Sequence, residues 1–296
     1  VGRCADYILR EHPRCANVFI SASKEDRIIR LCRIHNVNEE VAEEMIEKAD
    51  KRRSEYYKNL FDPVTRFMRG KDSGGNWRTP FNPMRLFHAG EVGGDFTEGN
   101  SWQYTWHVQQ DVEGLIALMG GKDVFVNKLD SLFMTEPEPD KMGKVLDVTG
   151  LIGQYAHGNE PSHHVIYLYN YVNCPWRTQE LIREVFERFY QARPDGLCGN
   201  DDCGQMSAWY VFSAMGFYPV NPCGGEYVIG APQLEEIIID LPDQKQFVVR
   251  AIDLSEANKY AKTITLNGKP LRDFRIYHSD IMKGGILEFV MTDKHD

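Results

Sequence analysis

Ser207-Ala-Trp-Tyr-Val-Phe-Ser-Ala-Met215, followed by Gly216-Phe-Tyr-Pro219, is where the sequence changes from a helical to a strand pattern. Upstream, apolar residues recur at helical spacing in the segments 112–119, 124–133, 165–172, 178–190 and 207–215. Downstream lie short runs rich in Val, Ile and Phe, at 226–230, 236–241, 246–252, 262–266 and 285–291. The sequence therefore predicts a mainly helical part over residues 1–219 and a β module over residues 220–296.

Turns and interruptions indicate how these segments are arranged. Asn267-Gly268 separates two strand-like runs and predicts a hairpin, so we expect an antiparallel, sandwich-like C-terminal module. Polar, glycine-rich segments interrupt the helices at 95–106, 153–164 and 196–207. Helices paired through short turns favour a helical toroid, and we expect the polar segments to gather at one end of it.

An earlier helix has a clear start signal. Asn38 before Glu39-Glu40 is a typical N-cap followed by acids that suit the positive end of a helix. Helical spacing then continues toward Leu60, until Asp62-Pro63 ends the helix. Residues 70–100 are rich in Gly, Pro and Asn, which predicts a long irregular loop of the kind that often carries function.

The composition excludes several classes of protein. The 296 residues are 42% hydrophobic and 26% charged, which is typical of a globular chain. The net charge of -9 argues against a nucleic acid partner. No apolar run reaches the roughly 18 residues of a membrane span.

The sequence leaves open both the cellular location of the protein and the redox state of its cysteines. The chain begins Val1-Gly2-Arg3-Cys4 without an initiator Met or a signal peptide, so we expect a piece of a longer protein. Seven cysteines are too sparse for a disulfide scaffold. Cys198 and Cys203 either form a bridge across their turn or remain free thiols.

Three segments concentrate carboxylates among glycine, amide and aromatic residues. In 95–106, Glu98 precedes Gly99-Asn100 and lies among large aromatics, as a general acid of a carbohydrate site would. The alternative is a helix N-terminus with a capping acid and core aromatics. In 196–210, one carboxylate of Asp201-Asp202 could activate a water, and the alternative is again an N-cap acid with a solvated neighbour.

The segment His157-Gly-Asn-Glu-Pro-Ser-His-His164 offers two kinds of metal ligand. The oxygens of Asn159 and Glu160 suit calcium, whereas the three histidines suit a transition metal such as zinc. No acid or cysteine stands at a standard zinc interval beside these histidines, and histidines near tight turns are often only hydrogen-bonded.

Taken together, these motifs resemble glycoside hydrolase family 92, the calcium-dependent exo-acting α-mannosidases. The resemblance is carried in order by Glu98-Gly-Asn-Ser-Trp-Gln-Tyr-Thr-Trp106, Gly158-Asn-Glu-Pro-Ser-His-His164, Tyr169-Asn-Tyr-Val172 with Pro175-Trp-Arg-Thr-Gln-Glu180, and Gly199-Asn-Asp-Asp-Cys-Gly-Gln-Met-Ser-Ala-Trp-Tyr210. It extends from about residue 50 to the end of the chain.

The resemblance implies an (α/α)6 barrel, incomplete in this chain, and removal of terminal α-linked mannose, typically α-1,2-linked, with inversion. Glu98 matches the general acid, Asp202 the general base and Asp201 a less certain catalytic neighbour. Asn159 and Glu160 match calcium-binding positions. Trp102, His157, Asn200 and Gln205, in the same motifs, are expected to contact the substrate, although Asn200 stands where some members carry an acid.

The expected partners are mannose-containing glycans and an N-terminal β-sandwich of the same protein that would complete the site. We therefore expect this piece alone to hydrolyse mannosides poorly or not at all. The resemblance also implies a periplasmic, extracellular or cell-surface location. Two alternatives remain: a catalytically inactive glycan-binding module, and another inverting (α/α)6 glycosidase, such as a trehalase-like hydrolase.

Overall fold

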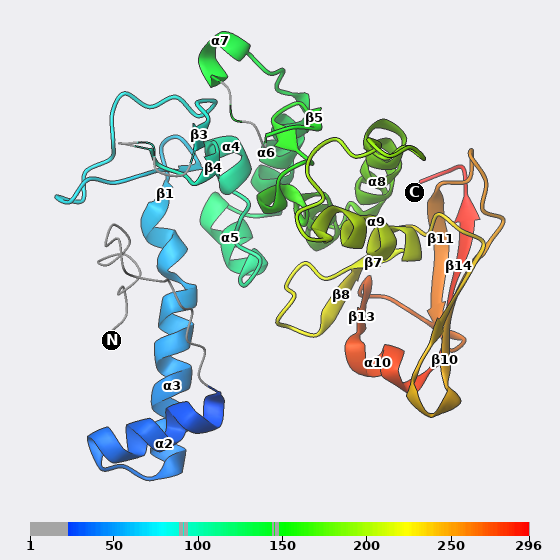
Figure 1. Ribbon diagram of the computed structural model, residues 1–296, viewed down its shortest axis with the longest axis horizontal. Helices are drawn as coiled ribbons and strands as arrows, with labels where there is room; N and C mark the ends of the chain where they lie inside the picture. The colour runs from blue at the N-terminus through cyan, green and yellow to red at the C-terminus, as the bar shows by residue number, and fades with distance from the viewer. Residues whose placement is uncertain (1–22, 89–90, 92–93, 144, 146–147, 296) are drawn as a thin grey trace. The chain divides into compact units, whose positions relative to one another are not determined.

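The computed structural model describes residues 23–88, 91, 94–143, 145 and 148–295. It divides into two compact units, residues 1–56 and 57–296, and each is described by itself (Figure 1). The start of the chain, from which a longer protein is expected, lies outside the described residues.

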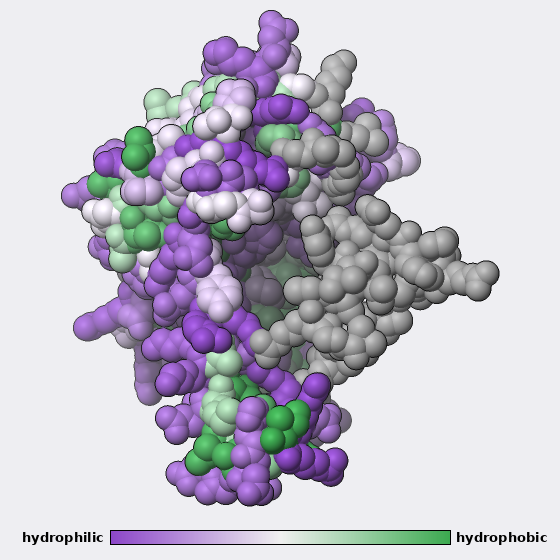
Figure 2. All heavy atoms as spheres, turned by 90° about the vertical axis from the view of Figure 1, so that its left-hand side faces the viewer, coloured by the Kyte–Doolittle hydropathy of each residue, from purple (hydrophilic) through white to green (hydrophobic). Residues whose placement is uncertain are grey.

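The first unit contains a helical hairpin of α2 (Lys24–His35) and α3 (Glu39–Ser54). Asn38 caps α3, as predicted: its side chain accepts a hydrogen bond from the backbone N–H of Val41 at 2.9 Å. An ion pair of 2.6 Å joins Arg27 to Asp50 across the hairpin. Figure 2 shows hydrophobic residues exposed among charged ones at this end of the chain.

In the second unit, helices and two-residue strands make up the chain as far as Met215, and the predicted long loop over 70–100 contains β3 and β4. The elements in order are η1 (Tyr56–Leu60), β1 (Phe61–Asp62), β2 (Phe67–Met68), β3 (Phe87–His88), β4 (Glu98–Gly99), α4 (Ser101–Tyr104), α5 (Val112–Met119), α6 (Lys122–Met134), α7 (Pro139–Met142), β5 (Leu151–Ile152), β6 (Tyr155–Ala156), η2 (Glu160–Ser162), η3 (Val165–Val172), α8 (Pro175–Phe189) and α9 (Gln205–Met215). The predicted helical segments are confirmed, with η3 as a 3-10 helix.

The C-terminal quarter is the predicted β module, followed in Figure 1 from yellow to red. Its elements are β7 (Phe217–Tyr218), β8 (Glu226–Ile229), β9 (Glu236–Asp240), η4 (Pro242–Gln244), β10 (Gln246–Ile252), β11 (Tyr260–Leu266), β12 (Lys269–Pro270), β13 (Arg275–Tyr277), α10 (His278–Lys283) and β14 (Gly285–Thr292). The hairpin at Asn267-Gly268 is confirmed, since Leu266 pairs with Lys269 in an antiparallel ladder.

One feature of the module corrects the sequence prediction. The five-stranded sheet has the order β12-β11-β14-β10-β9, and β10 pairs with β14 in parallel. The module is therefore mostly, not wholly, antiparallel. The cause is that β14, the last strand, enters between β10 and β11 rather than joining an edge.

Two large hydrophobic cores and a small third cluster fill the described part of this unit. The first core is built mainly from the helical segments and includes Trp209 and Val228, and the second core lies within the β module and includes Phe217 and Phe247. Since Val228 belongs to one and Phe217 to the other, the cores interleave in sequence around the predicted boundary. The division after residue 219 and a closed toroid both stay predictions.

Candidate active site

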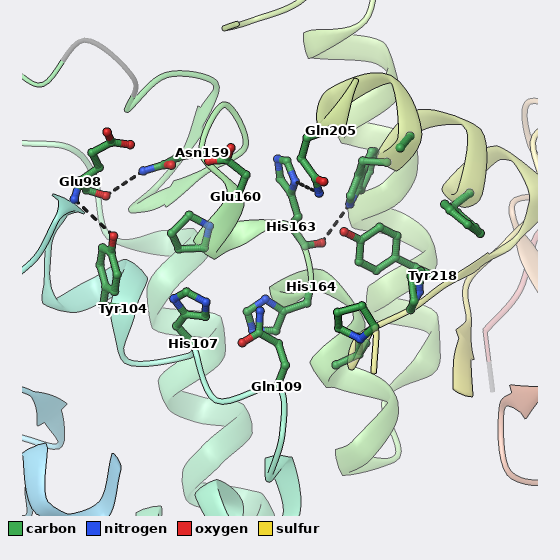
Figure 3. Close-up of a pocket in the computed structure, with 17 residues that line it drawn as sticks. Glu98, Tyr104, His107, Gln109, Asn159, Glu160, His163, His164, Gln205 and Tyr218 are labelled. Atoms are coloured by element: carbon green, nitrogen blue, oxygen red, sulfur yellow. Dashed lines mark hydrogen bonds between the residues drawn. The ribbon is translucent and has the colours of Figure 1, made fainter. Parts of the chain in front are cut away.

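A cavity of about 450 Å³ opens in the second unit, where the three polar segments singled out in the sequence meet. In Figure 3, Glu98, Tyr104 and Asn159 lie on one side of it and His163, Gln205 and Tyr218 on the other. Its lining residues are Glu98, Tyr104, His107, Gln109, Asn159, Glu160, Pro161, His163, His164, Gln205, Ala208, Trp209, Phe212, Tyr218, Pro219, Val220 and Pro222.

Glu98 is held at this cavity by its own backbone. Its carbonyl accepts a hydrogen bond from Nδ2 of Asn159 at 2.7 Å, and its N–H donates to the Tyr104 hydroxyl at 3.3 Å. Gly99 follows with φ of 139°, and a Cβ there would lie 2.5 Å from Oε1 of Gln103. The turn from the acid into α4 therefore requires glycine.

Asn159 and Glu160 reach the cavity from the turn before η2. Asn159 is 3% exposed. Because its Nδ2 donates to the Glu98 carbonyl, the orientation of the side-chain amide, and with it the position of Oδ1, is fixed. Glu160 is an exposed carboxylate at the first position of η2. The two predicted calcium positions thus lie at the same wall of the cavity as Glu98.

His157 lies beneath this wall and does not line the cavity. Tyr190 donates its hydroxyl proton to the Met206 carbonyl at 3.0 Å, so its oxygen accepts from Nε2 of His157 at 2.8 Å. Nδ1 of His157 is then an acceptor, and Tyr155 donates to it at 2.8 Å. His157 is fully buried against Trp209, and burial holds its pKa well below the ordinary value.

His163 and His164 face the cavity as neutral rings. Nε2 of His163 donates to the His157 carbonyl at 2.9 Å, which leaves Nδ1 to accept from Nε2 of Gln205 at 3.1 Å. Nε2 of His164 donates to the Trp106 carbonyl at 2.7 Å, and its buried Nδ1 has no hydrogen-bond partner among the described residues. Burial lowers the pKa of His163 to about 4 and that of His164 to about 3.

These bonds bear on the two metal interpretations. Both ring nitrogens of His157 and of His163 already have hydrogen-bond partners, so these rings are not arranged as zinc ligands. Within the described residues, no group of three or more His, Cys, Asp and Glu side chains is placed to hold a metal ion. Any cation here would depend on amide, carbonyl, water or substrate oxygens for most of its ligands.

Asp201 and Asp202, before α9, differ in what they do. Oδ1 of Asp201 accepts from the N–H of Ser207 at 3.0 Å and from its hydroxyl at 2.8 Å, so this carboxylate caps the helix. Asp202 is exposed, has a φ of 48°, and its charge acts on the ring of His163. Neither is among the lining residues, but Asp202 lies within electrostatic range of the cavity wall.

The remaining predicted substrate contacts fall in three different places. Gln205, the first residue of α9, lines the cavity, whereas Asn200 is exposed on the loop before that helix. Trp102 packs instead in the core, where its ring meets Phe67 edge-on at 4.8 Å and lies 4.2 Å from Nζ of Lys128. Its role in substrate contact stays a prediction that its position does not support.

Other residues of the cavity were not singled out in the sequence. Tyr104, His107, Gln109 and Tyr218 line it, and burial lowers the pKa of His107 and raises that of Tyr218 to about 12. Tyr104 lies within the Glu98–Trp106 motif and His107 directly follows it, which was the available signal. Tyr218 belongs to Gly216-Phe-Tyr-Pro219, which continues the last motif of the family resemblance, and that continuation was its signal.

Cys198 and Cys203 are free thiols, and burial raises the pKa of Cys198 to about 11, so the bridge between them is not formed. Among the described residues, no helix has the length and apolar character needed to cross a bilayer.

Comparison with known proteins shows the family of this chain. Residues 29–293 match the glycosyl hydrolase family 92 catalytic domain, and the chain belongs to this family. A family GH92 α-mannosidase from Bacteroides thetaiotaomicron, solved in complex with mannoimidazole, is 43% identical with a TM-score of 0.78 and aligns with 92% of this chain. A family GH92 inverting mannosidase from the same bacterium is 36% identical with a TM-score of 0.72, also over 92% of this chain.

A curated relative, described as an uncharacterized secreted glycosidase of Arthroderma benhamiae, is 31% identical over 197 residues, which is 66% of this chain. The chain spans 23% of that relative's length, 36% of the first mannosidase and 37% of the second.

Proposed function

We propose that this chain carries the catalytic carboxylates of an exo-acting α-mannosidase that removes terminal α-linked mannose, α-1,2-linked, from glycans. The observation behind this proposal is that the chain belongs to family 92 and brings Glu98, Asn159 and Glu160 together at one cavity. The two bacterial structures to which it is similar are described as mannosidases, one of them as inverting.

In this proposal Glu98 is the general acid. Its carboxyl group donates a proton to the glycosidic oxygen as the bond from that oxygen to C1 breaks. Asp202 is the general base: it takes a proton from a water that attacks C1 from the opposite face, so the first product is β-mannose. Asp202 is preferred to Asp201 because it matches the general base of the family, and because its charge acts on His163, which lines the cavity.

Calcium is the proposed cofactor, held by Asn159 and Glu160. These residues supply an amide oxygen and a carboxylate, both hard ligands, at the cavity wall. Two side chains leave most positions of a six- to eight-oxygen shell to carbonyls, waters and sugar hydroxyls, which suits a cation shared with the substrate. When bound, the ion would hold vicinal hydroxyls and favour a distorted ring.

The acid and base assignments are tested with Glu98→Gln and Asp202→Asn in the full-length gene product. We expect kcat on an α-1,2-linked mannose disaccharide to fall about 100- to 10,000-fold in each, since this is the usual contribution of general acid–base catalysis. Glu113→Gln, an exposed acid of α5 that does not line the cavity, is the matched control. Undiminished activity in both variants would refute the assigned roles.

The cofactor is tested in the same assay by chelation. We expect a chelator to abolish hydrolysis and calcium, but not zinc, to restore it, and we expect proton NMR to show β-mannose first. Sugar binding without hydrolysis in the intact protein would instead identify a glycan-binding module. Preferential cleavage of an aryl α-glucoside in a panel of aryl glycosides would point to another inverting glycosidase.

The cellular location is also part of the proposal. A relative at 31% identity is described as a secreted glycosidase, so we infer action in the periplasm or outside the cell. Cell fractionation with an antibody to this chain would check this.

A further inference from the structure

Gln154, at the tip of the β5–β6 hairpin, is a fully buried amide whose hydrogen bonds reach α6, the segment just after α6, and α4. Its backbone N–H donates to the Leu132 carbonyl at 2.7 Å, at the end of α6. Its side-chain Nε2 donates to the Glu136 carbonyl at 3.4 Å, just beyond that helix. The hairpin tip is thereby anchored to the C-terminal end of α6.

The same residue binds the start of α4 through two other amides. Oε1 of Gln154 accepts from Nδ2 of Asn100 at 3.2 Å, and its carbonyl accepts from Nε2 of Gln103 at 3.1 Å. Asn100 and Gln103 cap α4 reciprocally and are 0% and 2% exposed. We call these three residues, Asn100, Gln103 and Gln154, the amide cluster.

The amide cluster is connected to Glu98 in two ways, along the chain and through a hydrogen bond. Asn100 follows Glu98 by two residues. Gln154 directly precedes β6, which leads to Asn159, and Nδ2 of Asn159 donates to the Glu98 carbonyl at 2.7 Å. A shift of Gln154 relative to Asn100 would therefore move Glu98 relative to Asn159.

We propose that Gln154 is a positioning residue that sets the place of Glu98 relative to the Asn159 wall of the cavity. This rests on the proposed function, because it assumes that Glu98 is the general acid. Gln154 does not line the cavity, so it acts through the amide cluster rather than on the substrate. In a buried cluster every lost bond leaves an unpaired amide, which favours a rearrangement of the remaining partners.

The experiment compares two leaving groups in Gln154→Met, made in the full-length gene product. A mannose disaccharide needs protonation of its leaving oxygen, whereas dinitrophenyl α-mannoside does not. A displaced acid therefore slows the first substrate and spares the second. We expect the ratio of kcat on the aryl mannoside to kcat on the disaccharide to rise about tenfold or more, because a misplacement near 1 Å costs up to about 100-fold.

Gln179→Met is the matched control. Gln179 is also a buried amide, 3% exposed, and it joins Gly230 and Ala261 in another region. Gln179→Met should lower thermal stability as much as Gln154→Met does, while its kcat ratio stays within about twofold of wild type. An equal fall on both substrates in Gln154→Met would show a merely structural role and overturn the inference.

Two further comparisons keep the result decisive. Gln103→Met removes the bond to the Gln154 carbonyl from the other side, and the same rise in ratio is expected if Gln154→Met does not fold. Glu98→Gln separates the two proposals through the ratio of kcat on the aryl mannoside to kcat on the disaccharide. If this ratio rises in Glu98→Gln but in neither Gln154→Met nor Gln103→Met, only the positioning role is wrong. If the ratio is unchanged in Glu98→Gln, the role of Glu98 as general acid is wrong, and the proposed function with it.

Discussion

At the scale of single residues, hydrogen bonds decide which histidine nitrogen carries the proton. A carbonyl oxygen can only accept, so Nε2 is protonated in both His163 and His164. Nδ1 of His163 then accepts from Gln205, whereas the buried Nδ1 of His164 has no hydrogen-bond partner among the described residues. The histidine segment thus contributes neutral, oriented rings to the site.

These buried neutral rings predict a loss of stability in acid. The pKa of His163 is about 4 and that of His164 about 3 in the folded protein, against 6.5 for an ordinary histidine. Below pH 6.5 the histidines of the unfolded chain bind protons that they do not bind in the folded protein. The free energy of unfolding is therefore highest above pH 6.5 and falls as the pH is lowered toward 4. We expect about 1.4 kcal/mol per pH unit for each histidine.

Urea unfolding between pH 7.5 and 4.5 measures this dependence. His164→Gln removes one of the titrating rings, so below pH 6.5 its slope of unfolding free energy against pH should be smaller by about 1.4 kcal/mol per unit, with no difference in slope above 6.5. A variant slope equal to that of the wild type would contradict the assignment of a neutral, buried His164.

At the scale of elements, the turn at Asn267-Gly268 does more than join β11 to β12. The N–H of Asn267 donates to the Ile286 carbonyl at 2.8 Å, and its side-chain oxygen accepts from the Ile286 N–H at 2.8 Å. Both turn residues have positive φ, 51° and 75°. The turn thus extends the ladder to β14, the strand that enters between β10 and β11.

Replacing Asn267 should therefore weaken the β module. We expect Asn267→Ala to lower the unfolding free energy by about 1–2 kcal/mol, from the lost bond to Ile286 and a left-handed backbone that alanine disfavours. Asn267→Asp keeps an acceptor oxygen and should lose less. Chemical denaturation measures both, and equal losses would argue against the side-chain bond as the cause.

At the scale of the whole molecule, the chain covers little more than a third of the mannosidases to which it is similar. The resemblance implies that an N-terminal β-sandwich supplies another wall of the substrate pocket. We therefore expect this chain alone to hydrolyse mannosides far more slowly than the full-length gene product, because substrate orientation contributes strongly to rate. Parallel assays of this chain and the full-length gene product at equal concentration check this, and comparable turnover would show the prediction to be wrong.

Much of the helical and strand content could be predicted from the sequence. The segment 112–119 is helical and 246–252 is a strand with the predicted bounds, because apolar spacing reflects which face each element buries. The parallel pairing of β10 with β14 could not be predicted, since strand order depends on contacts between residues far apart in the chain. For the same reason, Trp102 was expected at the substrate and lies in the core.

The sequence by itself determined that Glu98, the Asn159 segment and the Asp202 segment are the chemically distinctive parts of this chain, because their composition and order are legible locally. Only the tertiary structure decided how they are used. It joined Asn159 to the Glu98 backbone, assigned Asp201 to a helix cap, and turned Gln154 toward Asn100. Such pairings depend on how elements distant in the sequence pack together, and a local sequence pattern does not predict that packing.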